Sequence, residues 1–302
     1  MPKAFPRGRI CWNDLMTTDP KAAQAFYTAT VGWGTQAWAG DSSYVMWTAR
    51  RTPVGGVAAL SDEARAMDTP PSWVMFVAVP DVDASMRQAV SLGGRTYVEP
   101  QDIPTMGRFA VLGDPHGAKF GVFSSSTAIP GHDGSSKPGE FSWHELASGD
   151  WRGAWGFYER MFGWVKMDTM DSPAGTYQMF GRGGLMLGGM YDKPLEMPAP
   201  PHWLCYALVP NVDSAAAVVQ RLGGQVLNGP MDIPGGGRIA QCVDPQGAAF
   251  ALHANAARAA AKPKRKPSAK KATKKATKKT AKKKPTKKTI KKKAKRKARR
   301  AR

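Results

Sequence analysis

The chain has 302 residues, and its 44 Lys and Arg residues outnumber its 23 Asp and Glu residues, giving a formal net charge of +21. No apolar run approaches the roughly 20 residues that span a bilayer, and the first residues lack the apolar core of a secretion signal. Three distant cysteines, Cys11, Cys205 and Cys242, match neither a disulfide framework nor a zinc site. The sequence therefore predicts a cytoplasmic protein with no membrane partner.

Charge divides the chain into two parts. Residues 258–302 contain 25 Lys or Arg and no Asp or Glu, whereas the first 257 residues contain 19 basic and 23 acidic residues. A slightly acidic body of this size can bury one large core or two ordinary ones. We therefore expect a folded body, followed by a basic tail over residues 255–302.

The first predicted elements are a strand and a helix. The strand covers Arg9–Thr17, which alternates in part and carries an aromatic residue. The helix covers Pro20–Thr30, because Asp19 offers a capping oxygen before it and Gly32 can end it. The later predicted elements are strands near Tyr44–Thr48, Val54–Ala59 and Trp73–Val79, a helix from Val82 to the Leu92-Gly93-Gly94 stop, a strand leading to a DIP motif, and strands on both sides of an Asp-Pro-x-Gly turn.

The second half of the body repeats this order. Residues 200–250 match residues 70–120 at 22 of 51 positions. The repeat predicts an α+β fold in which each copy contains the order βαβββ twice. We place one domain at 8–124 and the other at 139–254, joined by a linker rich in Ser, Gly and Pro over 125–138.

Three motifs occur in the same order in both copies. They are Asp-x6-Phe-Tyr-x4-Gly-Trp, a VPDVD or VPNVD junction before Leu-Gly-Gly, and a DPxGA hairpin. In this order, twice, they resemble the vicinal oxygen chelate superfamily, which includes glyoxalase I, bleomycin-resistance proteins and extradiol dioxygenases. The resemblance implies paired βαβββ modules, each pair forming a half-open barrel around a pocket.

Metal-using members of this superfamily hold a divalent ion with His, Glu or Gln side chains, and the ion polarises the vicinal oxygens of the substrate. The resemblance places one ligand at Trp12 or Trp143 and another at Gly121 or Ala251, and none of these residues can bind a metal. A third position would fall near Trp73-Val74 or Trp203-Leu204. We therefore expect no cofactor at the positions that the family uses.

A displaced metal site in the second copy is the alternative. His144, Glu145, His202 and His253 could surround one divalent ion if a bulge turned His144 inward. The protein would then be a glyoxalase-like lyase or an extradiol-type dioxygenase. The competing interpretation makes the histidines strand-end or surface residues and Glu145 a polar pocket or edge residue.

Aromatic residues at matching strand positions predict a different kind of site. Four tryptophans could line the half-barrels and hold a flat apolar molecule by stacking, or could simply fill them. With their polar neighbours, the candidate ligand pocket comprises Trp12, Asp14, Trp73, Trp143, His144, Glu145 and Trp203.

The tail consists mainly of Lys, Ala, Pro and Thr, and Ile290 is its only sizeable apolar residue. Such a segment cannot bury enough surface to fold alone, so we expect disorder. It resembles the tails of linker histones, and we expect it to bind nucleic acid or another polyanion by counterion release. A merely solubilising extension is the alternative. The candidate phosphate-binding residues are Lys270, Lys271, Lys274, Lys275, Lys278, Lys279, Lys291, Lys292, Lys293 and Arg296.

The leading hypothesis is a tandem-domain protein that binds a small apolar or aromatic molecule without the family's metal site. Its tail would hold it on nucleic acid, so the protein could associate with the nucleoid. The two rival hypotheses are the metal-dependent enzyme in the second copy and a catalytically inert scaffold.

Overall fold

The structure is a computed structural model that describes residues 6–129, 131–172 and 175–256. The first copy of the repeat contains eight strands and three helices. They are β1 (Ile10–Thr17), α1 (Pro20–Val31), β2 (Gly34–Trp38), β3 (Asp41–Ala49), β4 (Thr52–Ala59), α2 (Asp62–Ala66), β5 (Ser72–Ala78), α3 (Val82–Ser91), β6 (Arg95–Ile103), β7 (Gly107–Gly113) and β8 (Lys119–Ser125).

The second copy contains eight strands and two helices. They are β9 (Phe141–Ser148), α4 (Trp151–Phe162), β10 (Val165–Ser172), β11 (Gly175–Arg182), β12 (Leu185–Asp192), β13 (His202–Leu208), α5 (Val212–Arg221), β14 (Gln225–Asp232), β15 (Arg238–Val243) and β16 (Ala249–Ala254). The predicted tail begins at Asn255, and all but its first two residues lie outside the described part of the chain.

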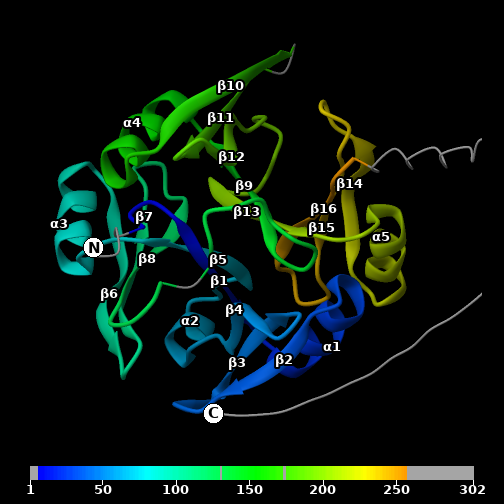
Figure 1. The fold of residues 1–302 in the computed structure, drawn as a ribbon, viewed down its shortest axis with the longest axis horizontal. Coiled ribbons are helices and arrows are strands. Elements are labelled where there is room, and N and C mark those ends of the chain that lie inside the picture. Colours follow the sequence, from blue (N-terminus) through cyan, green and yellow to red (C-terminus); the bar gives the residue numbers. More distant parts are fainter. Residues whose placement is uncertain (1–5, 130, 173–174, 257–302) are drawn as a thin grey trace, which may run out of the picture. The chain divides into compact units, whose positions relative to one another are not determined.

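Each copy forms its own mixed sheet of eight strands (Figure 1). The strand order is β2-β3-β4-β1-β5-β8-β7-β6 in the first sheet, and β10-β11-β12-β9-β13-β16-β15-β14 in the second. In the first sheet, β1 and β5 pair antiparallel at the centre, and β4 and β8 flank them in parallel. Both sheets are open. The element order of each copy is two βαβββ modules that share one sheet, so the predicted α+β class and the paired modules are confirmed.

The predicted helix ends follow from capping chemistry. Asp19 accepts a hydrogen bond from the backbone N–H of Ala22 at 2.9 Å, and Gly32 ends α1 in the left-handed conformation at φ 85°. Asp150 and Gly163 do the same for α4. A side-chain oxygen satisfies an orphan amide at the start of a helix, and glycine adopts positive φ without steric cost at its end. These boundaries are confirmed.

The sequence prediction omitted three elements. The edge strands β2 and β10 are mostly exposed, so they lack the apolar alternation that identifies a half-buried strand. The short helix α2 has no buried residue and no counterpart in the second copy, but Ser61 caps it by accepting a hydrogen bond from Ala64. All three therefore form without a core-facing pattern in the sequence.

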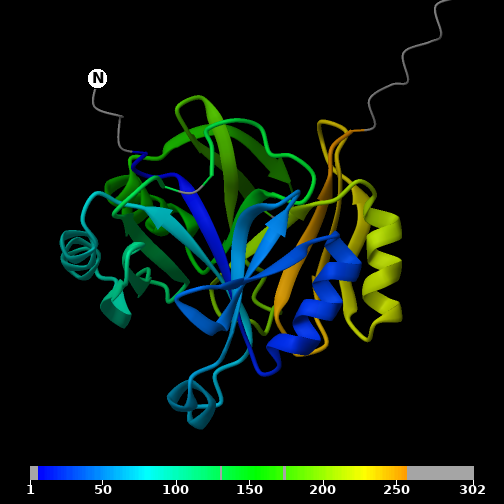
Figure 2. The same cartoon turned by 60° about the horizontal axis from the view of Figure 1, so that its bottom comes forward.

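The two copies pack around one shared core, which contains one face of each sheet and the buried sides of α1, α3, α4 and α5. Helices of the two copies pack in pairs: α1 lies beside α5, and α3 lies beside α4 (Figures 1 and 2). The hydroxyl of Tyr27 donates to Asp244 at 3.0 Å, and the hydroxyl of Tyr158 donates to Asp114 at 3.1 Å. The Phe-Tyr motif of one copy therefore contacts the DPxGA hairpin of the other, in both directions.

Among the helices that the structure describes, none combines the length and the apolar character needed to cross a membrane.

Candidate ligand-binding sites

The face of each sheet opposite the shared core is termed here the open face. Strand alternation assigns residues to it: Leu15 of β1 enters the shared core, whereas Trp12 packs against a separate small cluster with Phe76. In the second sheet, Trp143 packs with Tyr206 in a corresponding cluster. Each open face thus carries aromatic residues from its central strands.

The open face of the first sheet holds a hydrogen-bonded group of three residues, Trp12, Asp14 and Tyr44, termed the copy-one group. The indole N–H of Trp12 lies 2.8 Å from Asp14 Oδ1 and 2.8 Å from the Tyr44 hydroxyl. The Tyr44 hydroxyl donates to the same carboxylate oxygen at 2.6 Å. Burial raises the pKa of Asp14 to about 6, although these hydrogen bonds favour its charged form.

The second sheet carries the equivalent copy-two group, Trp143, Glu145 and Tyr177. Trp143 donates to the Tyr177 hydroxyl at 2.8 Å, and that hydroxyl donates to Glu145 Oε2 at 2.9 Å. Tyr206 and Gln241 donate to Oε1 at 3.0 and 3.1 Å. Burial raises the pKa of Glu145, and its three donors oppose that shift.

Glycines make room for both tyrosines. A Cβ atom added to Gly56 would overlap the Tyr44 hydroxyl, and one added to Gly189 would overlap the Tyr177 ring. The adjacent Gly55 and Gly188 permit close approach of the neighbouring strands. Gly56 and Gly189 therefore make room for the tyrosine that contacts the carboxyl group, and Gly55 and Gly188 make room for the backbone of the next strand.

The metal positions that the family resemblance implies fall on the open faces. Trp12 pairs with Phe76, which in turn pairs with Gly121, so these residues form one row across β1, β5 and β8. The middle residue is Phe76, not the region of Trp73-Val74 expected from the sequence. The matching row in the second sheet is Trp143, Tyr206 and Ala251. Neither row offers the His, Glu or Gln donor set that this kind of metal site requires.

The four donors of the displaced metal site do not converge. His144 Nε2 lies 3.0 Å from Asn13 Oδ1 on the side of the shared core, whereas the neighbouring Glu145 belongs to the open face. His202 contacts the carbonyl of Pro200, and His253 contacts Ser142. In the described ranges, no group of three or more His, Cys, Asp or Glu side chains could hold a metal ion.

Trp73 and Trp203 lie apart from the other candidate pocket residues. Both are 5% exposed and belong to the shared core. The indole of Trp73 donates to the Tyr27 hydroxyl at 3.0 Å, and that of Trp203 donates to the Tyr158 hydroxyl at 2.8 Å. The structure therefore gathers Trp12 with Asp14, and Trp143 with Glu145, but places these two tryptophans at the contact between copies.

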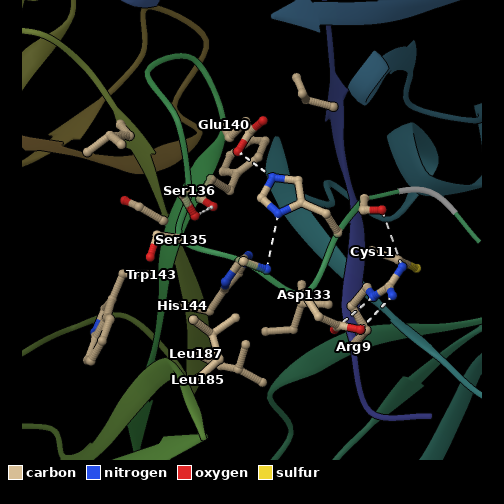
Figure 3. Close-up of a pocket in the computed structure, with 18 of the residues that line it drawn as sticks. Arg9, Cys11, Asp133, Ser135, Ser136, Glu140, Trp143, His144, Leu185 and Leu187 are labelled. Carbon is tan, nitrogen blue, oxygen red and sulfur yellow. Dashed lines mark hydrogen bonds and ion pairs between the residues drawn. The ribbon is translucent and has the colours of Figure 1, made fainter. Parts of the chain in front are cut away.

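A cavity of about 340 Å³ lies between the two copies (Figure 3). Residues from β1, β4, β9, β11, β12, β13 and β16 line it, and Trp143 borders it as well as the open face. Residues 131–136 of the predicted linker also line it, and we call this segment the strap. Sequence reasoning missed the cavity because its walls come from distant segments.

Two histidine contacts, one buried and one partly buried, mark this cavity. Asn13 and His144 occupy equivalent repeat positions and contact each other, and burial lowers the pKa of His144 to about 3. His253 Nδ1 lies 2.9 Å from Ser142 Oγ, and burial lowers its pKa also. Both histidines are therefore neutral at physiological pH.

Comparison with known proteins identifies one family and several relatives. Residues 9–123 match the model of a family described as "Glyoxalase-like domain". "Putative glyoxylase CFP32" of Mycobacterium bovis is 36% identical over 258 residues, which cover 83% of this chain and 97% of that protein. "Anthracycline biosynthesis protein DauV" of Streptomyces sp. (strain C5) is 30% identical over 262 residues, covering 82% and 94% of the two chains.

Solved structures share the fold at lower identity. The Mn(II)-bound glyoxalase from Novosphingobium aromaticivorans superposes with a TM-score of 0.57 at 17% identity and covers 84% of each chain. An extradiol ring-cleaving dioxygenase from B. fuscum has a TM-score of 0.59 at 14% identity, covering 84% of this chain and 74% of that one. These similarities concern architecture, since fold alone does not determine chemistry.

Proposed function

Because the chain belongs to the glyoxalase-like family, we propose that it binds a flat, largely apolar small molecule that also carries a hydroxyl group. The ligand binds on the open faces, without a divalent ion at the family's ligand positions. One observation carries this proposal: both open faces repeat a hydrogen-bonded Trp, Tyr and carboxyl group. Trp and Tyr rings offer surfaces for stacking, and a carboxylate accepts hydrogen bonds from ligand hydroxyls.

We expect the copy-two group to bind the ligand more tightly than the copy-one group, because more side chains orient its carboxyl group. Glu145 accepts three hydrogen bonds from the described residues, and a carboxylate has about four acceptor positions, so a ligand hydroxyl can add to them. Tyr191 stacks beside Tyr177 with ring centroids 6.0 Å apart, which extends the aromatic surface. The name of the Streptomyces relative supports a polycyclic ligand, because anthracyclines contain flat fused rings with phenolic hydroxyls.

Titration of the full chain with 1,8-dihydroxyanthraquinone, followed by quenching of tryptophan fluorescence, tests this proposal. Glu145→Gln and Tyr177→Phe should each raise the dissociation constant about tenfold, which corresponds to about 1.4 kcal/mol. Asp14→Asn should raise the dissociation constant of a second, weaker binding phase, which reports the copy-one group.

The matched control is Glu159→Gln, which changes an exposed carboxylate on α4. It should leave both phases unchanged. Equal affinity in wild type, Glu145→Gln and Tyr177→Phe would remove the basis of the proposal.

The second part of the proposal concerns the tail, and it rests on sequence because residues 257–302 lie outside the described part. Its 25 positive charges and absence of acidic residues support non-specific binding to nucleic acid. Contacts with phosphates release counterions, so affinity should fall linearly on a logarithmic salt scale, with a slope of about −0.9 per neutralised phosphate.

Gel-shift titrations with two unrelated DNA duplexes at several salt concentrations test the tail. We expect equal affinity for both duplexes, a steep salt dependence and loss of binding when residues 258–302 are deleted. Retained binding in the deletion, or strong preference for one duplex, would contradict this role.

A further inference from the structure

In the cavity between the two copies (the interface cavity), two arginines, one from each copy, hold a single carboxylate. Arg9 pairs with Asp133 through two hydrogen bonds, Nε to Oδ1 at 3.1 Å and Nη2 to Oδ2 at 2.8 Å. Arg182 Nη1 contacts Asp133 Oδ1 as well. Two arginines therefore share one carboxylate, which the strap supplies, whereas the other carboxylate of the lining, Glu140, contacts His132 at 3.0 Å and the backbone N–H of Lys137 at 2.8 Å.

The exposure of these side chains is unequal. The Arg9 and Arg182 side chains are 15% and 23% exposed, whereas the Asp133 side chain is 47% exposed. The guanidinium groups are thus held inside the cavity, and the carboxylate reaches them from the solvent side. They also hold the pKa of Asp133 below its usual range.

Backbone carbonyls, one of them in the strap, hold both arginines in addition to the Asp133 side chain. Arg182 Nε donates to the carbonyl of Arg7 at 2.6 Å, and Arg9 Nη1 donates to the carbonyl of Gly131 at 3.3 Å. The planar guanidinium fork binds carboxylates in a bidentate way. The two groups therefore stay oriented toward a carboxylate even if Asp133 leaves.

Apolar side chains lie next to this charged group. The cavity walls include Val54, Phe141, Leu185 and Leu187, and Figure 3 shows Leu185 and Leu187 among the lining residues with Arg9 and Asp133. The volume of about 340 Å³ lies in the range of small-molecule sites, roughly 300–1,000 Å³. An apolar wall beside paired guanidinium groups matches a molecule with one carboxylate and a compact apolar body.

From this geometry we propose that the interface cavity is a second ligand site, which binds a small organic carboxylate. The ligand's carboxylate takes the place of Asp133 between Arg9 and Arg182, and its apolar part contacts Leu185, Leu187 and Val54. Asp133 acts as an internal competitor, and its side chain turns toward solvent while the strap backbone, with the Gly131 carbonyl that anchors Arg9, stays in place. Of the residues in the two open-face groups, only Trp143 borders this site, and the proposal does not depend on the function proposed for those groups.

Calorimetric titration of the full chain with benzoate tests the proposal, with benzamide as the neutral probe of the same shape. Asp133→Asn should bind benzoate at least about tenfold more tightly than wild type, because it removes a tethered carboxylate of millimolar effective concentration. Arg182→Gln should lose benzoate binding. Benzamide should bind neither wild type nor any variant more tightly than benzoate binds wild type.

A tighter complex in Asp133→Asn cannot result from misfolding, so this variant keeps the test decisive even if Arg182→Gln folds poorly. The control Arg238→Gln removes an arginine that pairs with Asp213 and Asp232 outside the cavity, and it should bind benzoate as wild type does. All variants retain the basic tail, so its attraction for anions cancels. Unchanged affinity in Asp133→Asn, or equal binding of benzamide and benzoate, would overturn the proposal.

Discussion

At the scale of single residues, the burial of His144 against Asn13 lowers the free energy of unfolding by an amount that depends on pH. Burial lowers the pKa of His144 to about 3, whereas the unfolded histidine titrates near 6.5. Between these values the unfolded state binds more protons, so this residue makes the fold less stable as pH falls below about 6.5.

The variant His144→Gln tests this linkage, because an amide can still reach Asn13 but does not titrate. The stability advantage of wild type over the variant should shrink by about 1 kcal/mol between pH 7.5 and 5.5. Urea unfolding at both pH values measures it. A stability difference between wild type and variant that does not change with pH would contradict the burial of a neutral His144. The control is His202→Gln, at a histidine outside the interface.

Gly189 supports a second prediction at this scale. In Gly189→Ala the new methyl group overlaps the ring of Tyr177 and displaces its hydroxyl from Glu145. Overpacking of this kind costs about 1–3 kcal/mol, and ligand affinity should fall with it. Thermal unfolding and the dihydroxyanthraquinone titration measure both effects.

Gly156→Ala is the matched control for that variant. It lies within α4, where an added Cβ meets only the end of the Arg160 side chain at 3.9 Å. Alanine favours a helix over glycine by about 0.5–1 kcal/mol, so this control should be slightly more stable. If Gly189→Ala behaves in the same way, the fit between Gly189 and Tyr177 is not needed.

The sequence could predict part of the site and not the rest. Trp12, Asp14, Trp143 and Glu145 were predicted as pocket residues, and the structure places them on the open faces. Tyr44 and Tyr177 occupy matching repeat positions, which was a signal for both groups. Their partners were not predictable, because a hydrogen bond from β3 to β1 depends on the register of three strands.

At the scale of elements, the strongest predictions came from caps and turns. Asp19, Gly32, Asp150 and Gly163 set helix ends through local contacts, so they can be identified without knowledge of the fold. The edge strands β2 and β10 depend on pairing with β3 and β11, and their exposed sequences carry no periodic signal. Non-local pairing therefore explains which elements were missed.

The reciprocal contact between α1, α4 and the two hairpins gives a prediction at this scale. Tyr27→Phe and Tyr158→Phe each remove a hydroxyl that donates to a buried aspartate and accepts from a tryptophan. Each should lower the free energy of unfolding by about 1–3 kcal/mol, because buried polar groups lose their partners. The two losses should be similar, since the two contacts are equivalent.

Chemical denaturation of the two variants measures these losses. Tyr97→Phe is the control, because Tyr97 is 44% exposed and such surface changes usually stay within about 0.5 kcal/mol. A loss in only one of the two core variants would show that the copies do not support each other equally. No loss in either would contradict the role of these hydroxyls.

At the scale of the whole molecule, duplication produces two kinds of surface that we propose as ligand sites. The repeated motifs predicted the tandem fold, and the family relationship is confirmed by the curated relatives. Each open face belongs to one copy and was partly predictable from that copy's residues. The interface cavity needs both copies and the strap together, so no single segment of sequence indicated it.

The family's metal chemistry is the main alternative at this scale. The rows Trp12-Phe76-Gly121 and Trp143-Tyr206-Ala251 lack suitable donors, although solved proteins of the same fold include a Mn(II)-bound glyoxalase. Aromatic and carboxyl groups occupy the open faces instead. The central claim is therefore ligand binding on these faces that needs no divalent ion.

The most direct test is the dissociation constant of 1,8-dihydroxyanthraquinone for the full chain, measured once with a chelator and once with added Mn²⁺ or Fe²⁺. Tryptophan fluorescence reports binding, and a blank titration corrects for complexes between the ligand and the metal. The account predicts the same affinity under both conditions, together with a tenfold loss in Glu145→Gln. Binding that appears only with the metal, or that Glu145→Gln leaves unchanged, would contradict it.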